Sequence, residues 1–189
     1  MSNRLRGGDA MERETIEKAR AGDMGAFEAI YREHAGMVFG VALRIVGRVE
    51  DAEEVVQDVF VSVHRSLGHF QGKSSFKTWV YRIAVNMSLN ILRRGRLARQ
   101  SELRMPEGAE FEDGRNTFED RLAVEEREVR VSELLELLSP DQRACMALRV
   151  SAGLSYEEIA QTLNVNINTV RTRLRRAREV LLKARAQRR

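Results

Sequence analysis

Residues 155–178 read SYEEIAQTLNVNINTVRTRLRRAR and predict two helices joined by a tight turn. Ser155 and Glu158 have the spacing of a capping box, in which each side chain bonds the other residue's backbone amide at a helix start. The stretch from Asn164 to Asn168 supplies the turn, because asparagine tolerates backbone angles that most residues avoid. The second helix then repeats apolar residues at helical spacing: Val170, Leu174, Ala177 and Leu181. This order of elements is the helix-turn-helix layout.

The outer side of that second helix is basic and polar. Its stripe consists of Arg171, Arg175 and Arg178, with Thr172 and Arg176 beside it. Arginine can bond a guanine edge with two donors or neutralise a phosphate, and the major groove of DNA admits one helix. From residue 163 onward the chain carries nine basic side chains against one acidic. The pattern indicates a polyanionic partner, with DNA as the leading candidate and an ordinary solvated basic helix as the alternative.

The composition of the 189 residues points to a helical protein without catalytic or metal chemistry. Hydrophobic residues make up 43% of the chain, which excludes a wholly disordered protein, and only two prolines interrupt it. The single cysteine, Cys145, excludes an internal disulfide and a cysteine zinc framework. We expect no signal peptide, no membrane span, no cofactor and no metal site. Cys145 is expected to be a small core residue.

Three further helices are predicted in the first half of the chain. The first begins at Asp23 as its cap and ends at Gly47, the second covers about residues 50–67, and the third about 75–94. Their apolar residues recur at spacings of three and four, and no strand alternation is visible. The predicted fold class is therefore all-α.

An acid-rich stretch separates these helices from the helix-turn-helix. It contains Pro106, Gly108 and Gly114 and lacks helical periodicity. A segment this long without its own structure is typical of a linker. We therefore predict a domain over residues 1–96, a flexible acidic linker over 97–117 and a second domain over 118–189. The linker is expected to leave the charged faces of both domains exposed.

The second predicted helix has an acidic face opposite its valines. This face carries Asp51, Glu54, Gln57 and Asp58. Such a surface repels nucleic acid and suits a basic protein partner. The alternative is a solvated acidic face near a helix N-terminus, where carboxylates are stabilised.

The third predicted helix combines basic side chains, side-chain amides and an aromatic ring. Residues 73–96 hold six basic side chains and no acidic one. One stripe runs through Trp79, Arg82, Asn86, Asn90 and Arg93, with Lys77 on the same helix and Phe70 in the loop before it. Unstacked bases of single strands stack on aromatic rings and bond polar side chains through their exposed edges. The alternative for Trp79 is core packing.

These segments resemble a known family. Residues 51–60 (DAEEVVQDVF) and 70–86 (FQGKSSFKTWVYRIAVN) resemble the second region of bacterial sigma factors of the extracytoplasmic-function group. Residues 138–143 (LSPDQR), 153–160 (GLSYEEIA) and 169–173 (TVRTR) resemble the fourth region. The resemblance covers about 26–96 and 130–183. It implies a cytoplasmic transcription initiation factor that is not an enzyme.

The resemblance also implies a role for each matching residue. Core RNA polymerase would be bound by Asp51, Glu54, Gln57 and Asp58. The opened minus-ten promoter element would be bound by Phe70, Lys77, Trp79, Arg82, Asn86 and Arg93. The minus-thirty-five element would be bound, as duplex DNA, by Asn168, Thr169, Arg171, Thr172, Arg175 and Arg176. An anti-sigma protein that covers both domains is a further implied partner.

The residues alone leave two other classes of protein open, a stand-alone helix-turn-helix regulator and an RNA-binding module that uses the Trp79 stripe.

Overall fold

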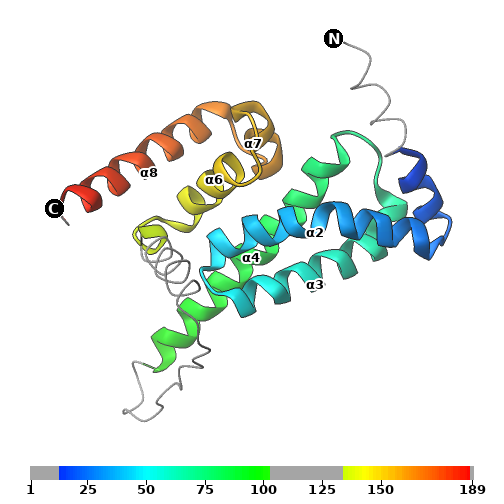
Figure 1. The fold of residues 1–189 in the computed structure, drawn as a ribbon. Helices are drawn as coiled ribbons and strands as arrows, with labels where there is room; N and C mark the ends of the chain where they lie inside the picture. Colours follow the sequence, from blue (N-terminus) through cyan, green and yellow to red (C-terminus); the bar gives the residue numbers. More distant parts are fainter. Residues whose placement is uncertain (1–12, 103–133, 188–189) are drawn as a thin grey trace, which may run out of the picture.

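The computed structural model describes residues 13–102 and 134–187, and all regular structure in these two ranges is helical (Figure 1). The first half, residues 13–102, holds a helix over 13–20, α2 (Met24–Val46), α3 (Val49–Ser66), the 3-10 turn η1 (Leu67–His69) and α4 (Phe76–Glu102). The second half, residues 134–187, holds α6 (Pro140–Val150), α7 (Tyr156–Leu163) and α8 (Ile167–Gln187). The all-α fold class is confirmed.

The ends of α2 and α6 are set by local side-chain and backbone chemistry. The carboxylate of Asp23 accepts a bond from the amide of Ala26 at 3.0 Å, which caps α2 as predicted. Gly47 ends α2 with φ at 86°, in the left-handed region that favours glycine. A second capping box, formed by Ser139 and Gln142, starts α6. Its Ser-x-x-Gln spacing is visible in the sequence, although the predicted helix starts above do not include it.

The first core lies between α2, α3 and α4. Four valines of α3 face inward: Val55, Val59 and Val63 have no exposed surface and Val56 is buried beside them, whereas Val49 and Val61 are exposed. Phe76 and Val80 of α4 pack against the same core. The face of α3 that is left outside is the acidic one.

The helix over residues 13–20 is part of this first half, and it is absent from the predicted helices. Ile16 is 5% exposed and Ala19 is 9% exposed, and both pack in the first core. Burial of an isoleucine side chain stabilises a fold by about 1.5–3 kcal/mol. The helix is therefore fixed on the bundle through Ile16 rather than projecting from it.

α4 is longer than predicted. It continues to Glu102, beyond the end near Arg94 that the loss of apolar periodicity suggested. The reason is that Leu97, Ala98, Arg99 and Gln100 favour helix regardless of amphipathic pattern. The rest of the predicted linker, residues 103–117, lies outside the described residues.

The two halves pack against each other. α6 and α7 lie on α2 and α4, and one core cluster crosses between the halves (Figure 1). Val41 and Tyr81 of the first half meet Cys145 and Ile159 of the second in this shared core. The expectation that the linker leaves both charged faces exposed is therefore wrong for the part of α4 that α7 covers. The apolar stripes of α2 and α4 are wider than the first core needs, so each helix has a second apolar face for α6 and α7.

Two hydrogen bonds also cross between the halves. Arg143 of α6 is 5% exposed, and its Nη1 donates to the carbonyl oxygen of Ile45 at 2.9 Å. Arg82 of α4 donates through Nη2 to the carbonyl oxygen of Gln161 in α7 at 2.6 Å. Both carbonyls belong to the last turn of a helix, where carbonyl groups lack a partner within the helix.

Candidate nucleic-acid interface

The helix-turn-helix prediction is confirmed in its local geometry. The hydroxyl of Ser155 accepts from the amide of Glu158 at 3.2 Å, and the carboxylate of Glu158 accepts from the amide of Ser155 at 2.7 Å. This backbone bond lowers the pKa of Glu158, because it stabilises the ionised form. Asn164 turns the chain with φ at 52°, and the side chain of Asn166 accepts from the amide of Asn168 at 2.8 Å.

α8 separates an apolar side from a basic side. Val170, Leu174 and Ala177 are buried, with at most 1% of each exposed. The residues that the sequence assigns to duplex DNA lie on the other side: Asn168, Arg171, Thr172, Arg175 and Arg176 are exposed, and Thr169 is half-buried. They form one continuous face at the N-terminal part of α8, which suits insertion into a groove.

Four arginines of α8 already have side-chain partners, and one of them, Arg178, donates to the hydroxyl of Tyr156 at 3.4 Å. Arg171 donates to the side-chain oxygen of Asn168 at 2.8 Å, and Arg175 forms an ion pair with Glu179 at 2.7 Å. Arg173 points to the other side, where it pairs with Asp141 of α6 at 2.6 Å. The Arg175 pair is exposed, and such pairs contribute only about 0.3–0.5 kcal/mol. A phosphate can therefore replace Glu179 at little cost.

The acidic face of α3 lies on the surface. Glu54, Gln57 and Asp58 are exposed and Asp51 is half-buried. The buried valines occupy the opposite side of the same helix. The structure thus brings the four residues that the sequence assigns to a protein partner onto one solvent-facing surface.

The residues that the sequence assigns to single-stranded bases do not form one exposed stripe. Asn86 and Arg93 are exposed, whereas Phe70, Trp79 and Arg82 are half-buried. Asn86 lies two helical turns from Trp79, which is about 10 Å along the axis. Lys77, also half-buried, places its ammonium 5.8 Å from the centre of the Tyr81 ring. Arg82 is the residue among these that bonds to the other half of the chain, because its guanidinium donates to a carbonyl oxygen of α7.

Phe70, Phe76 and Trp79 form an aromatic cluster. The ring centres of Phe70 and Trp79 lie 5.2 Å apart, and those of Phe76 and Trp79 lie 5.6 Å apart. All three rings pack on the first core. Trp79 therefore packs on the core, the alternative considered for it above, and it also backs the ring of Phe70.

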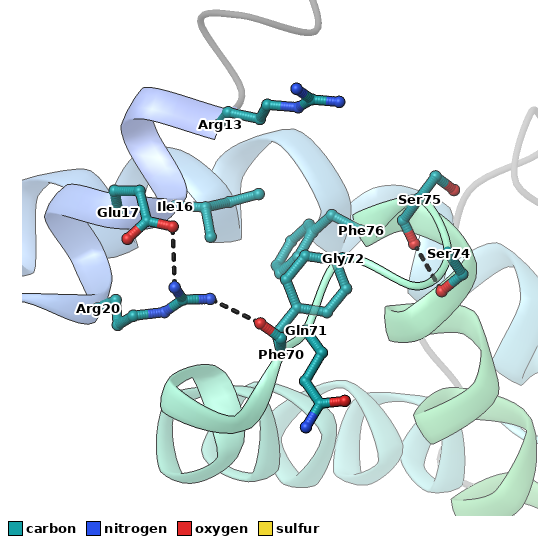
Figure 2. A pocket seen from close by; sticks show the side chains of 10 residues that line it. All are labelled: Arg13, Ile16, Glu17, Arg20, Phe70, Gln71, Gly72, Ser74, Ser75 and Phe76. Carbon is teal, nitrogen blue, oxygen red and sulfur yellow. Dashed lines mark hydrogen bonds and ion pairs between the residues drawn. The ribbon is translucent and has the colours of Figure 1, made fainter.

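A pocket of about 570 Å³ opens beside this cluster (Figure 2). Its walls come from two parts of the chain. The helix over 13–20 contributes Arg13, Ile16, Glu17 and Arg20. The loop before α4 and the first residue of α4 contribute Phe70, Gln71, Gly72, Ser74, Ser75 and Phe76. This volume lies in the range of small-molecule sites, so the pocket has room for a nucleobase.

The four residues from the helix over 13–20 are not among the predicted site residues. A weak signal was present: Glu14 and Lys18 have the i, i+4 spacing that supports a helix, and their side chains lie 2.8 Å apart in the structure. Ile16 and Ala19 share one face of this helix at a spacing of three. Eight residues are too few for periodicity to indicate which surface the helix covers.

Other candidate chemistry is sparse among the described residues. In these two ranges no group of three histidine, cysteine, aspartate or glutamate side chains could hold a metal ion. Cys145 has no exposed surface, and burial raises its pKa to about 11. Its predicted place in a core is confirmed. No helix in the part of the chain that the structure describes is long and apolar enough to cross a membrane.

The fold and the basic face of α8 define a helical DNA-binding protein of the helix-turn-helix class. Residues 30–98 match the family model of Sigma-70 region 2, and residues 128–181 match that of Sigma-70, region 4. The chain belongs to the sigma-70 family, in its extracytoplasmic-function group. It is thus a transcription initiation factor, which the sequence resemblance had implied.

Curated relatives cover nearly the whole chain. The chain is 34% identical to the RNA polymerase sigma-H factor of Pseudomonas aeruginosa over 92% of its own length and 93% of the relative's. It is 36% identical to the ECF RNA polymerase sigma-E factor of Escherichia coli K12, over 88% of its length and 90% of the relative's. These matches favour the initiation factor over the stand-alone regulator and the RNA-binding module.

Two solved structures share the fold. CnrH, in complex with the cytosolic domain of CnrY, aligns with a TM-score of 0.72 at 23% identity, covering 93% of this chain and 97% of CnrH. The sigma factor RpoE of Bartonella quintana, in complex with the anti-sigma factor NepR, aligns with a TM-score of 0.62 at 25% identity. That alignment covers 83% of this chain and 94% of the RpoE chain.

Proposed function

We propose that the two halves of this sigma factor divide promoter recognition: the first half binds the opened minus-ten element and the second half binds the minus-thirty-five duplex. The observation that carries the proposal is that one chain holds both a pocket with room for a base, beside an aromatic cluster, and an exposed arginine face on α8. A pocket suits a base that has left its stack, whereas a helix face suits an intact groove.

In the first half, the ring of Phe70 forms one side of the pocket and stacks on the base that enters it. Gln71 and Glu17 also line the pocket and carry polar atoms for the edges of a base. Asn86 and Arg93 lie farther along α4 and contact the neighbouring nucleotides of the unpaired strand. Trp79 packs against the ring of Phe70 and supports it, and it does not itself stack on a base.

In the second half, α8 enters the major groove with its N-terminal turns. Arg171 and Arg176 are exposed and can reach base edges or phosphates. Thr172 lies between them and suits contact with a thymine methyl group or a polar edge. Asn168 and Thr169 stand at the start of the helix, and their side chains can bond a phosphate.

The acidic face of α3 binds core RNA polymerase. Glu54, Gln57 and Asp58 form a solvent-facing surface whose charge fits a basic partner. The polymerase supplies the bond-forming chemistry, and the sigma factor contributes recognition and strand separation without catalysis. The protein acts in the cytoplasm, where the polymerase and the promoters are.

The closed packing of the halves fits an inhibited form. Arg82 is assigned to promoter DNA, yet its guanidinium is bonded to α7. The sigma factor RpoE of Bartonella quintana, which shares this fold, was solved in complex with an anti-sigma factor. We therefore propose that an anti-sigma protein binds across the two halves in this closed arrangement and competes with the polymerase.

Reconstitution with core polymerase tests the proposed division. The holoenzyme should make promoter thymines reactive to permanganate around the minus-ten element, and protect the minus-thirty-five duplex from nuclease. Neither core polymerase nor the chain alone should produce the permanganate signal. Protection of duplex DNA by the free chain, with no opening in the holoenzyme, would contradict the proposal in favour of the stand-alone regulator.

A further inference from the structure

The helix over residues 13–20 forms a wall of the candidate base pocket, although it lies before residue 30, where the match to Sigma-70 region 2 begins. Ile16 and Ala19 anchor this helix in the first core, so the wall has a fixed position. Arg13, Glu17 and Arg20 of the same helix line the pocket, and Arg20 extends to Phe70 in the loop before α4 (Figure 2). The pocket is therefore completed by a segment that the region 2 model does not include.

Arg20 connects this helix to the loop through two hydrogen bonds, and a third holds its guanidinium on its own helix. Its Nη2 donates to the carbonyl oxygen of Phe70 at 2.7 Å, and its Nε donates to the carbonyl oxygen of Leu67 at 3.4 Å. Its Nη1 donates to the carboxylate of Glu17 at 2.8 Å (Figure 2). Leu67 begins the 3-10 turn η1 and Phe70 follows its last residue, so one guanidinium bonds both ends of the turn.

The loop that Arg20 holds is the one that presents Phe70. The amide of Phe70 bonds the carbonyl of Leu67 at 3.1 Å, and two residues later Gly72 turns the chain with φ at 66°. Such a short turn allows several backbone arrangements, and a ligand that orders it would bind more weakly for that reason. The planar fork of arginine can bond two carbonyls and a carboxylate at once, whereas lysine offers a single nitrogen.

We propose that Arg20 is a positioning residue that fixes the Phe70 loop against the helix over 13–20, so that the pocket is shaped for one unpaired base before DNA arrives. The inference rests on the proposed function, because it assumes that the pocket takes a base. Glu17 holds the guanidinium in place and keeps its charge balanced. Arg20 acts through the loop and contributes no phosphate contact of its own.

The single tryptophan of the chain provides the readout. Trp79 lies 5.2 Å from the ring of Phe70, so its emission should report a base that stacks on Phe70. The full chain is titrated with the 12-nucleotide single strands dA, dC, dG and dT, at salt concentrations from 50 to 300 mM. The parent should show quenching of Trp79 and a preference among the four strands, since a shaped pocket distinguishes bases.

Arg20→Ala should weaken binding of the preferred strand by about three- to tenfold and reduce the preference among strands, while the slope of log affinity against log salt stays unchanged. Arg20→Lys should restore only part of the lost affinity.

Lys18→Ala is the matched control, because Lys18 is exposed on the same helix, pairs with Glu14 and does not line the pocket. It should keep the parent's preference. Circular dichroism on each variant shows whether the bundle is intact.

Three outcomes separate failure of this inference from failure of the base site. A salt slope reduced by about 0.7 in Arg20→Ala, with the preference among strands intact, would show that Arg20 contacts phosphate and would overturn its positioning role. Binding of all four strands by Arg20→Ala with the parent's affinities would overturn that role as well. If the parent itself shows no quenching with any strand, the base site is wrong and the role of Arg20 with it.

Discussion

Nη2 of Arg82 lies 2.6 Å from the carbonyl oxygen of Gln161, and this bond joins the helix assigned to opened promoter DNA to the first helix of the helix-turn-helix. Around it, the residues of the shared core are buried from both sides. Nε of Arg82 is itself buried without a partner, as is the hydroxyl of Tyr81 in the shared core. Unsatisfied polar atoms of this kind each weaken an interface, so the contact between the halves is suited to opening.

The reactivity of Cys145 should report that opening. Cys145 has no exposed surface in the shared core, and its raised pKa, about 11, keeps the thiol neutral near pH 8. Because the thiolate is the reactive form, iodoacetamide should alkylate the free protein slowly. Addition of core polymerase should accelerate alkylation at least tenfold if the halves separate on assembly. Equal rates with and without polymerase, measured by mass spectrometry, would show that the shared core stays closed.

Stability should fall at alkaline pH because of two groups in the same core. Burial raises the pKa of Cys145 to about 11 and that of Tyr81 to about 12, from ordinary values of 9.0 and 10.0. The fold thus favours the neutral forms, and the unfolded chain ionises first. The free energy of unfolding should be unaffected by these groups below pH 9 and decrease as pH rises toward 12. Urea unfolding of the parent and of Cys145→Ala separates the two contributions, since only the Tyr81 part remains in the variant.

Charge reversal on α3 should weaken assembly with the polymerase. The double variant Glu54→Lys, Asp58→Lys changes two exposed side chains, so the fold should be retained. Repulsion from a basic partner should reduce affinity for core polymerase by roughly tenfold or more, with the largest effect at low salt. Glu28→Lys, Glu33→Lys reverses the same charge on exposed positions of α2 and serves as the control. Equal loss in both double variants, by fluorescence anisotropy, would indicate a general charge effect.

Removal of a base contact should impair strand opening selectively. Phe70→Ala and Asn86→Ala should each reduce permanganate reactivity of minus-ten thymines roughly tenfold, because one stacked base is worth about 1–3 kcal/mol. Nuclease protection of the upstream duplex should be retained. His69→Ala changes an exposed neighbour of Phe70 that does not line the pocket, and it should open the promoter normally. Parent-like reactivity in Phe70→Ala would argue against the pocket.

Removal of Glu179 should strengthen duplex binding. Glu179 pairs with Arg175 at 2.7 Å on the exposed side of α8, so its carboxylate lies beside the arginines proposed to bind duplex DNA. Glu179→Ala should free Arg175 and raise affinity of the holoenzyme for the minus-thirty-five duplex about two- to fivefold, with a steeper salt dependence. Glu157→Ala, an exposed acid at the start of α7, tests whether any lost carboxylate gives the same gain. A decrease in affinity would mean that the pair is needed to orient Arg175.

Much of the local structure could be predicted from the sequence. Asp23, Gly47 and the Ser155–Glu158 box mark helix ends because capping bonds join residues only three or four positions apart. The buried side of α8 follows from its apolar spacing for the same reason. The exposed acidic face of α3 and the exposed arginines of α8 are what remains when the apolar side of each helix is buried.

The tertiary structure alone decided which surfaces meet. Val41 and Tyr81 carry no sign in the sequence that their partners are Cys145 and Ile159, more than 60 positions away, rather than the first core. From the sequence, Arg82 is one of several basic side chains on a helix. Only the packing of α7 against that helix gives its guanidinium a hydrogen-bond partner. Arg20 likewise reads as a surface charge until its helix is placed beside Phe70, about 50 positions later. Helical periodicity fixes which side of a helix is apolar, because the spacing is local, but the choice of partner for that side depends on how distant segments share one core.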